Sequence, residues 1–356
     1  MKTRQMLPIP GFFNPANASN FHYESPLVND SVLLTKTAQD YAKQHDIKSA
    51  GSQAKNITLL GIDLQKSFCF PEGTLFVGGR SGDGAIQDNI RFAEFIYRNI
   101  DVIKDIKLSM DTHFLFQIFF TTFWVDQNDQ HPAPNTMITT DDVRTGKYRP
   151  DPRMAHWLVN GNYAWLLRQS LFYVEQLEKE NKYQLFLWPP HTLLGTQGHN
   201  LAGVIQEAAF FHAMVRGNQT GYEIKGGNHL TENYSILSPE VLLTWDNNPL
   251  DQKNTDFIKT LIAADYLIIG GQAASHCVKS TIDDLLAEMQ NHNPELVKKV
   301  YILRDCMSAV AIPNGKGGFF VDFTDDANNA LDRFANAGMH VVNSTDPIET
   351  WPDFKL

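Results

Sequence analysis

The sequence has few cysteines and no excess of basic residues. Its 356 residues include three cysteines, Cys69, Cys277 and Cys306, which are far apart and form no CxxC pair. A disulfide framework is therefore not expected, and a reducing compartment is the better prediction. The formal net charge of −10 disfavours a nucleic acid as partner, because phosphate binding needs clustered Lys and Arg.

Long hydrophobic runs are also missing. The most apolar stretch, Phe114–Trp124, is too short to span a bilayer and contains Gln and Thr. The N-terminal residues lack the apolar core of a signal peptide. We therefore expect a cytoplasmic protein that does not bind membranes.

Apolar runs alternate with amphipathic helical stretches after residue 55. Strands are expected at 57–63, 106–111, 184–188, 222–225, 266–269, 300–305 and 339–343. Helices are expected at 32–44, 83–103, 165–182, 201–216, 276–290 and 322–337. This alternation predicts an α/β fold with three αβα layers and a mostly parallel central sheet of Rossmann-like topology.

The chain is expected to form one main domain with additions. Residues 1–55, rich in Asn, Pro and Ser, read as an arm that lies on the main domain at 56–346, and residues 347–356 read as a tail. The segment at about 125–183 interrupts the alternation with a proline-rich loop and an amphipathic helix. Such an insertion is predicted to be a lid or a subunit contact, with a peripheral decoration as the alternative.

Four reactive side chains lie at or just after predicted strand ends, where ligands bind in parallel sheets: Asp63, Asp111, Lys225 and Cys277. Ser275 is a plausible N-cap, which would place Cys277 in the first turn of a helix and lower its pKa. A carboxylate and a lysine beside a thiol can together move its proton. The alternative interpretations are that Cys277 is an unreactive core residue, that Asp63 is a turn carboxylate and that Lys225 is solvated.

Five motifs in order resemble those of cysteine hydrolases of the isochorismatase-like superfamily, in particular nicotinamidases. They read GIDLQKSF at 61–68, MDTH at 110–113, WPPHTLLGT at 188–196, EIKG with a following ENYS at 223–235, and GQAASHCV at 271–278. The resemblance covers residues 57 to about 343. It implies a catalytic triad of Asp63, Lys225 and Cys277, and an oxyanion hole formed by the backbone N–H groups of Ala273 and Cys277. It also implies a cis peptide near Gln272–Ala273.

The same resemblance implies a divalent metal beside the triad, at Asp111, His113 and His191. An Asp-x-His at a strand end with a distant histidine is a mixed nitrogen and oxygen site suited to Zn, Fe or Mn. The alternative is that the histidines are satisfied by hydrogen bonds.

Several positions depart from the family pattern. The family commonly has a His or Ser a few residues after Asp-x-His, whereas Phe114–Phe120 is almost entirely apolar, so that His131 or Thr121 would have to substitute. Thr192 stands where a Cys is usual, and Ser275 stands where an Asp is usual.

The resemblance implies an amidohydrolase that cleaves the C–N bond of a small, nicotinamide-like amide through a thioester on Cys277. Phe68, Trp124 and Trp188, with Phe123, are candidates for an apolar substrate pocket, although core packing is the alternative for each. A homo-oligomer is also expected. The alternative functions are a non-catalytic ligand- or metal-binding protein of the same fold, and a hydrolase of carbamoyl, ureido or isochorismate-like substrates.

Overall fold

The computed structural model describes residues 4–179 and 184–356. In these residues a central sheet of six strands runs in the order β12-β9-β8-β1-β2-β7, and all neighbouring strands are parallel. The strands are β1 (Ile57–Ile62), β2 (Asp105–Asp111), β7 (Gly221–Lys225), β8 (Tyr266–Gly271), β9 (Val300–Leu303) and β12 (His340–Val342). The expected parallel α/β sheet is confirmed.

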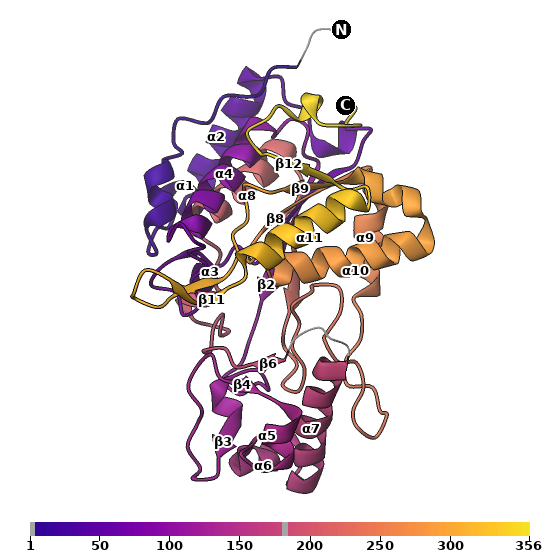
Figure 1. Cartoon of the computed structure of the whole chain (residues 1–356). Coiled ribbons are helices and arrows are strands. Elements are labelled where there is room, and N and C mark those ends of the chain that lie inside the picture. Colours follow the sequence, from indigo (N-terminus) through magenta and orange to yellow (C-terminus); the bar gives the residue numbers. More distant parts are fainter. Residues whose placement is uncertain (1–3, 180–183) are drawn as a thin grey trace.

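Helices cover both faces of the sheet (Figure 1). One face packs against α2 (Ser31–Gln44), α4 (Gly84–Arg98) and α8 (Gly203–Arg216), and the other against α9 (Thr255–Ala263), α10 (Cys277–His292) and α11 (Thr324–Asn336). Side chains of β1 alternate between these layers: Ile57 and Leu59 join the first core, and Leu60 and Ile62 join the second. Burial on both faces explains why β1 is a continuous apolar run.

The N-terminal segment lies on the main body through a buried carboxylate. Glu207 of α8 accepts hydrogen bonds from the hydroxyl groups of Tyr23 and Ser25 in this segment and of Tyr97 in α4. Three hydroxyl donors compensate for the desolvation of the carboxylate. The segment includes the short helix α1 (Pro26–Asn29).

Residues 124–179 and 184–186 contribute a separate lobe, seen at the lower end of Figure 1. Here β3 (Trp124–Asp126) pairs antiparallel with β5 (Tyr148–Pro150), and β4 (Met137–Ile138) pairs antiparallel with β6 (Leu185–Phe186). The lobe's helices are α5 (Thr140–Arg144), α6 (Ala155–Leu158) and α7 (Tyr163–Lys179).

The expected strand 184–188 is the main correction to the fold. It shortens to β6, which belongs to the lobe instead of the central sheet, because a short apolar run does not specify its partner. The last residues of the helix expected at 165–182 lie outside the described residues. Helix α9 was missed, as were α3 (Lys66–Cys69) and the hairpin of β10 (Ala311–Pro313) and β11 (Phe319–Asp322).

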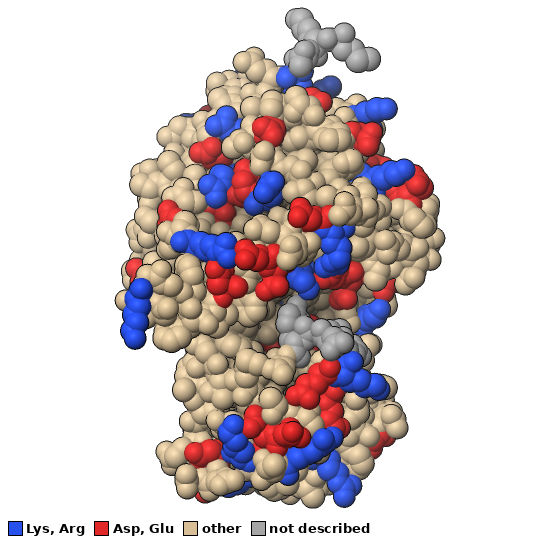
Figure 2. Space-filling model, viewed as in Figure 1, with Lys and Arg blue, Asp and Glu red and all other residues tan. Residues whose placement is uncertain are grey.

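Lys and Arg side chains lie among Asp and Glu side chains on the face shown in Figure 2, over both the main body and the lobe. Within the described residues, no helix combines the length and the apolar character that crossing a membrane requires.

Candidate active site

The reactive side chains come from neighbouring parallel strands. Asp63 directly follows β1, and Asp111 and Lys225 are the last residues of β2 and β7. Cys277 is the first residue of α10, which follows β8 after a short connection. Because β8, β1, β2 and β7 are adjacent in the sheet, their carboxyl ends bring these residues to one edge.

Lys225 connects the predicted triad. Its Nζ lies 3.0 Å from Asp63 Oδ2 and 3.6 Å from Cys277 Sγ. The same ammonium donates to Asp111 Oδ1 and to the backbone oxygen of Asn233, both at 2.8 Å. Asp63, Lys225 and Cys277 are all buried. The structure therefore places Asp63 and Cys277 within direct reach of the third predicted catalytic side chain, the Lys225 ammonium.

Asp111 has a second contact that the sequence interpretation missed. It was predicted only as a metal ligand, but one of its oxygens pairs with Lys225 while the other faces His113 and His191. Asp111 and Lys225 are register partners in the β2–β7 pair. The sequence placed both residues at strand ends, but only the strand order of the structure shows that these two ends are neighbours.

The charges of the site are tightly balanced. Burial by itself lowers the pKa of Lys225, but the carboxylates of Asp111 and Asp63 outweigh it and raise this pKa well above its usual range. Burial raises the pKa of Asp63, and Lys225 opposes this rise. Lys225 is thus held as a cation between two carboxyl groups.

The expected low pKa of Cys277 is a correction. Burial raises the pKa of this thiol well above its usual range; Lys225 opposes the rise, and the nearby carboxylates of Asp63 and Asp111 add to it. The predicted N-cap, Ser275, is also wrong: the N-cap residue is His276, and the Ser275 hydroxyl instead accepts from the Val310 N–H. The environment thus favours the thiol form of Cys277 over the thiolate.

Asp63 is suited to take that proton. Among the described residues, no hydrogen bond of standard geometry reaches its Oδ2, although this oxygen lies beside Lys225. The Cys277 thiol interacts with the Asp63 carboxylate as a hydrogen-bonding group. The Asp63 carboxylate is therefore positioned as a proton acceptor for Cys277.

Two backbone N–H groups are available near the thiol. A cis peptide bond joins Gln272 and Ala273, as the family resemblance implied. Ala273 and Cys277 both line the cavity. Within the described residues, neither N–H donates a hydrogen bond to the protein. Cys277 is the first residue of α10, where backbone N–H groups lack intrahelical partners.

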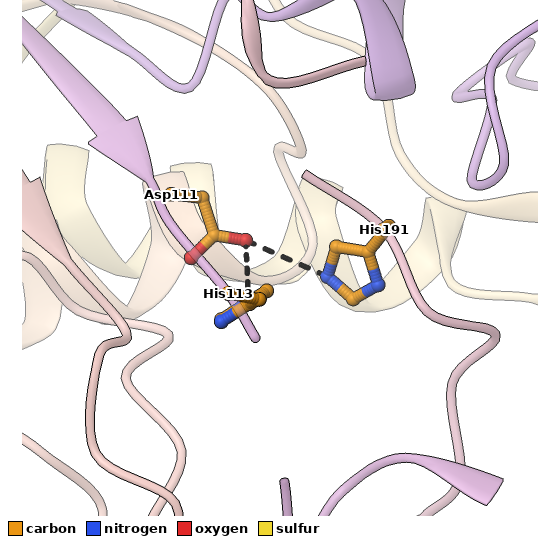
Figure 3. Close-up of side chains that lie close together, drawn as sticks. All are labelled: Asp111, His113 and His191. Atoms are coloured by element: carbon orange, nitrogen blue, oxygen red, sulfur yellow. Dashed lines mark ion pairs between the residues drawn. The ribbon is translucent and has the colours of Figure 1, made fainter. Parts of the chain in front are cut away.

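The three predicted metal ligands form a compact buried cluster (Figure 3). His113 Nε2 lies 2.8 Å and His191 Nε2 lies 3.5 Å from Asp111 Oδ2. The Nδ1 atoms face backbone oxygens, 3.0 Å from Gly226 O and 2.8 Å from Pro189 O. Since a carbonyl accepts only from an N–H, Nδ1 of each ring carries a proton, and Nε2 is the ring nitrogen that faces the carboxylate and can bind a metal.

This donor set fits a divalent cation. One ligand atom from each of the two imidazoles and the carboxylate lies within 4.8 Å of the others, close enough to bind a single ion. Gly226 permits the arrangement, because it has φ of 87° and a Cβ there would meet the His113 ring at 2.5 Å.

The substitute fourth ligands are not at the cluster. His131 Nδ1 lies 2.7 Å from the backbone oxygen of Trp124, and its Nε2 faces Arg153. Thr121 is not among the residues that line the cavity. Three protein ligands with remaining open positions are typical of catalytic metal sites.

A small cavity opens beside Cys277. Phe68 and Trp188 line it, as predicted. Trp124 does not: it is fully buried and its Nε1 donates to the Ile118 backbone oxygen. Phe123 is likewise a core residue. Sequence interpretation missed four polar or aromatic residues that line the cavity: Glu232, Asn233, Tyr234 and His276.

Comparison with known proteins returned structures of nicotinamidases and pyrazinamidases. The yeast nicotinamidase has 18% sequence identity and a TM-score of 0.48, over 81% of this chain and 99% of that one. A nicotinamidase/pyrazinamidase of Acinetobacter baumanii has 17% identity and a TM-score of 0.46, over 83% and 99%. A pyrazinamidase of Pyrococcus horikoshii in complex with zinc has 16% identity and a TM-score of 0.42, over 81% and 99%.

No protein-family model and no curated protein matches the chain. The structures found belong to the isochorismatase-like superfamily, which is the family that the sequence motifs resemble. At these identities and TM-scores, the argument for function rests on the side chains of this chain and their geometry.

Proposed function

We propose that this protein is a cysteine amidohydrolase that cleaves the C–N bond of a small amide, with heteroaromatic amides such as nicotinamide as the first candidates. One observation carries the proposal: the Lys225 ammonium contacts both the Asp63 carboxylate and the Cys277 sulfur in a buried cavity. A nucleophile, a proton acceptor and a compensating cation are the groups that acyl transfer needs.

The proton moves first. Asp63 Oδ2 accepts the proton of the Cys277 thiol, and Lys225 stabilises the thiolate that forms. The sulfur attacks the carbonyl carbon of the amide, and a C–S bond forms. The backbone N–H groups of Ala273 and Cys277 stabilise the negative oxygen, an interaction worth about 3 kcal/mol for each donor.

Release then follows in two steps. Asp63 returns the proton to the amide nitrogen, the C–N bond breaks, and ammonia leaves a thioester on Cys277. Water attacks the thioester carbonyl while Asp63 accepts its proton. The C–S bond breaks, the carboxylic acid leaves, and the proton returns to the thiol of Cys277.

Asp111, His113 and His191 would hold a divalent ion beside this reaction. Such an ion would serve as a Lewis acid for a substrate heteroatom or for water. The residues themselves contribute orientation, because the backbone oxygens of Gly226 and Pro189 fix both imidazole rings.

The test is ammonia release from nicotinamide, pyrazinamide and benzamide, with carbamoyl and isochorismate-like compounds as competing substrate classes. Cys277→Ala is expected to lower turnover by about a thousandfold or more while the protein stays folded. Cys306→Ala is the matched control, because Cys306 is buried but does not line the cavity. Mass spectrometry of quenched wild-type enzyme is expected to show an acyl adduct on Cys277.

Two results would contradict the proposal. Retained turnover in Cys277→Ala would exclude this nucleophile. Tight binding of amides by the wild type without turnover or adduct would instead identify a ligand-binding protein that keeps the fold.

A further inference from the structure

Gln272 lies directly before Ala273, whose N–H is one of the two proposed oxyanion donors, and its side chain is fully buried. Gln272 Nε2 donates to Asp88 Oδ2 at 2.9 Å, and Gln272 Oε1 accepts from the Ser308 backbone N–H at 3.4 Å. Because a backbone N–H can only donate, the Ser308 contact determines which end of the amide faces Asp88. The Gln272 side chain is therefore held in one orientation.

The backbone on either side of the Ala273 N–H is also fixed. The Gln272 N–H donates to the oxygen of Ile62, the last residue of β1, at 2.8 Å. The Ala274 N–H donates to the Ser308 oxygen at 2.7 Å. The planar peptide group that carries the Ala273 N–H begins at Gln272, so that the Gln272 side chain adds a third restraint on its direction.

Asp88 is a buried carboxylate on α4, with an exposed fraction of 1%. Its Oδ1 pairs with Arg91 Nη2 at 2.9 Å, and Arg91 Nε also donates to the Asp305 backbone oxygen. Each carboxylate oxygen of Asp88 thus accepts from an N–H group. A buried ion pair is a costly way to join a helix to a sheet, because apolar side chains of similar size serve equally well.

Asp88 does not reach the reacting atoms. Among the described residues, the lining of the cavity includes Ala273 and Cys277 but neither Asp88 nor Gln272. Any effect of Asp88 on the reaction therefore passes through Gln272 and the peptide group that follows it.

We propose that Asp88 is a positioning residue of the oxyanion hole. By accepting the Gln272 amide N–H, it holds the adjoining peptide group so that the Ala273 N–H points at the substrate oxygen that becomes negative. This inference rests on the proposed function for the reaction in which that oxygen forms. Loss of a whole oxyanion donor typically lowers kcat by about a hundredfold to a thousandfold, and a misdirected donor is expected to lower it by about tenfold to a hundredfold.

Kinetics of the full-length protein on the best amide tests the contact from both ends. Asp88→Leu and Gln272→Leu are each expected to lower kcat by about tenfold to a hundredfold with little change in KM, because the donor acts on the transition state. Asp88→Asn keeps an oxygen that can accept from Gln272 and is expected to restore most of the activity. The double Leu variant should lose no more than either single variant, since both remove one contact.

Binding of an aldehyde separates positioning from packing. Pyridine-3-carbaldehyde, which corresponds to nicotinamide, forms a tetrahedral adduct in which Cys277 Sγ bonds to the carbonyl carbon and the thiol proton passes to the carbonyl oxygen. Its affinity is expected to fall by about tenfold in both Leu variants. Nicotinamide binding by Cys277→Ala proteins that carry the same changes should stay within about twofold, because no tetrahedral oxygen forms there.

Asn89→Ala is the matched control. Asn89 lies beside Asp88 on α4 and is equally buried, but its side chain contacts Cys69 instead of Gln272. This variant is expected to have a lower melting temperature with unchanged kcat and aldehyde affinity. Thermal unfolding verifies that every variant is folded.

Four results would overturn the inference: unchanged kcat and aldehyde affinity in both Leu variants, an Asp88→Asn variant as deficient as Asp88→Leu, additive losses in the double variant, or equal weakening of aldehyde and amide binding. Failure of both Leu variants to fold would make the contact purely structural and would overturn it as well. A wild-type protein that neither hydrolyses an amide nor forms the aldehyde adduct would overturn the proposed function instead.

Discussion

Ser109 and Asp63 form a reciprocal pair of hydrogen bonds across neighbouring strands. The Ser109 hydroxyl donates to Asp63 Oδ1 at 2.5 Å and accepts from the Asp63 backbone N–H at 3.0 Å. Asp63 has a φ of 49°, an uncommon conformation for a residue other than glycine. Ser109 thus occupies one carboxylate oxygen and leaves the other turned toward Lys225 and Cys277.

Ser109→Ala is expected to lower kcat by about tenfold to a hundredfold with little change in KM, because Asp63 loses about 1–3 kcal/mol of orienting interaction. Steady-state kinetics on the best amide provides the measurement. Ser170→Ala is the control: Ser170 is equally buried, and its hydroxyl has no hydrogen-bond partner among the described residues. An unchanged kcat in Ser109→Ala would show that Asp63 needs no such positioning.

His191→Ala is expected to reduce the content of bound divalent metal from about one per chain to nearly none. The reason is that the loss of one of the three protein ligands leaves only two to bind the ion. Elemental analysis after loading and dialysis measures it for Zn, Fe and Mn. His131→Ala should retain its metal, because this residue faces Trp124 and Arg153 away from the cluster. Absence of metal from the loaded wild-type protein would contradict the metal site itself.

Tyr173→Phe tests how the lobe acts on the cavity. The change leaves the buried Glu232 N–H without its acceptor, which costs about 1–3 kcal/mol of unfolding free energy. We expect a lower melting temperature and a higher KM. Tyr163→Phe, which also loses a hydrogen bond from α7 but one made to Pro150 of the lobe, should leave KM unchanged. Equal KM values in both variants would make the lobe's contact purely structural.

His212 is expected to make stability fall in acid. Burial lowers its pKa to about 4 from 6.5, so that the unfolded chain binds the proton more readily than the folded one. The contribution is therefore complete above pH 6.5 and is lost as the pH falls toward 4, by at most about 3 kcal/mol. His276, with a pKa lowered to about 3 by burial, acts in the same direction.

Chemical unfolding of the wild type and of His212→Gln between pH 7 and pH 4 measures this slope. The variant is expected to be less stable at pH 7 and to lose less stability in acid. His292→Gln, a change of an exposed histidine, should follow the wild type. Parallel curves for wild type and His212→Gln would refute the assignment.

For the segment at about 125–183, the sequence predicted an insertion but not its contact with the site. Its departure from the βα alternation predicted an addition to the main domain, and none of its described residues lines the cavity. That it limits substrate size stays a prediction. Its contact with the site runs through Tyr173, whose position in an apolar helical stripe is typical of a core residue and carries no sign of this contact.

The sequence by itself determined the parallel sheet and the edge where Asp63, Asp111, Lys225 and Cys277 meet. Buried parallel strands are continuous apolar runs, and their carboxyl ends share one edge of the sheet. The local sequence pattern is therefore sufficient to predict both the sheet and this edge. Only the tertiary structure decided that Asp111 joins Lys225 to the histidines, that Ser109 holds Asp63, and that Glu232 rather than Trp124 faces the cavity. These depend on strand order and on burial, which also sets the pKa of Cys277, and neither is a local property of the chain.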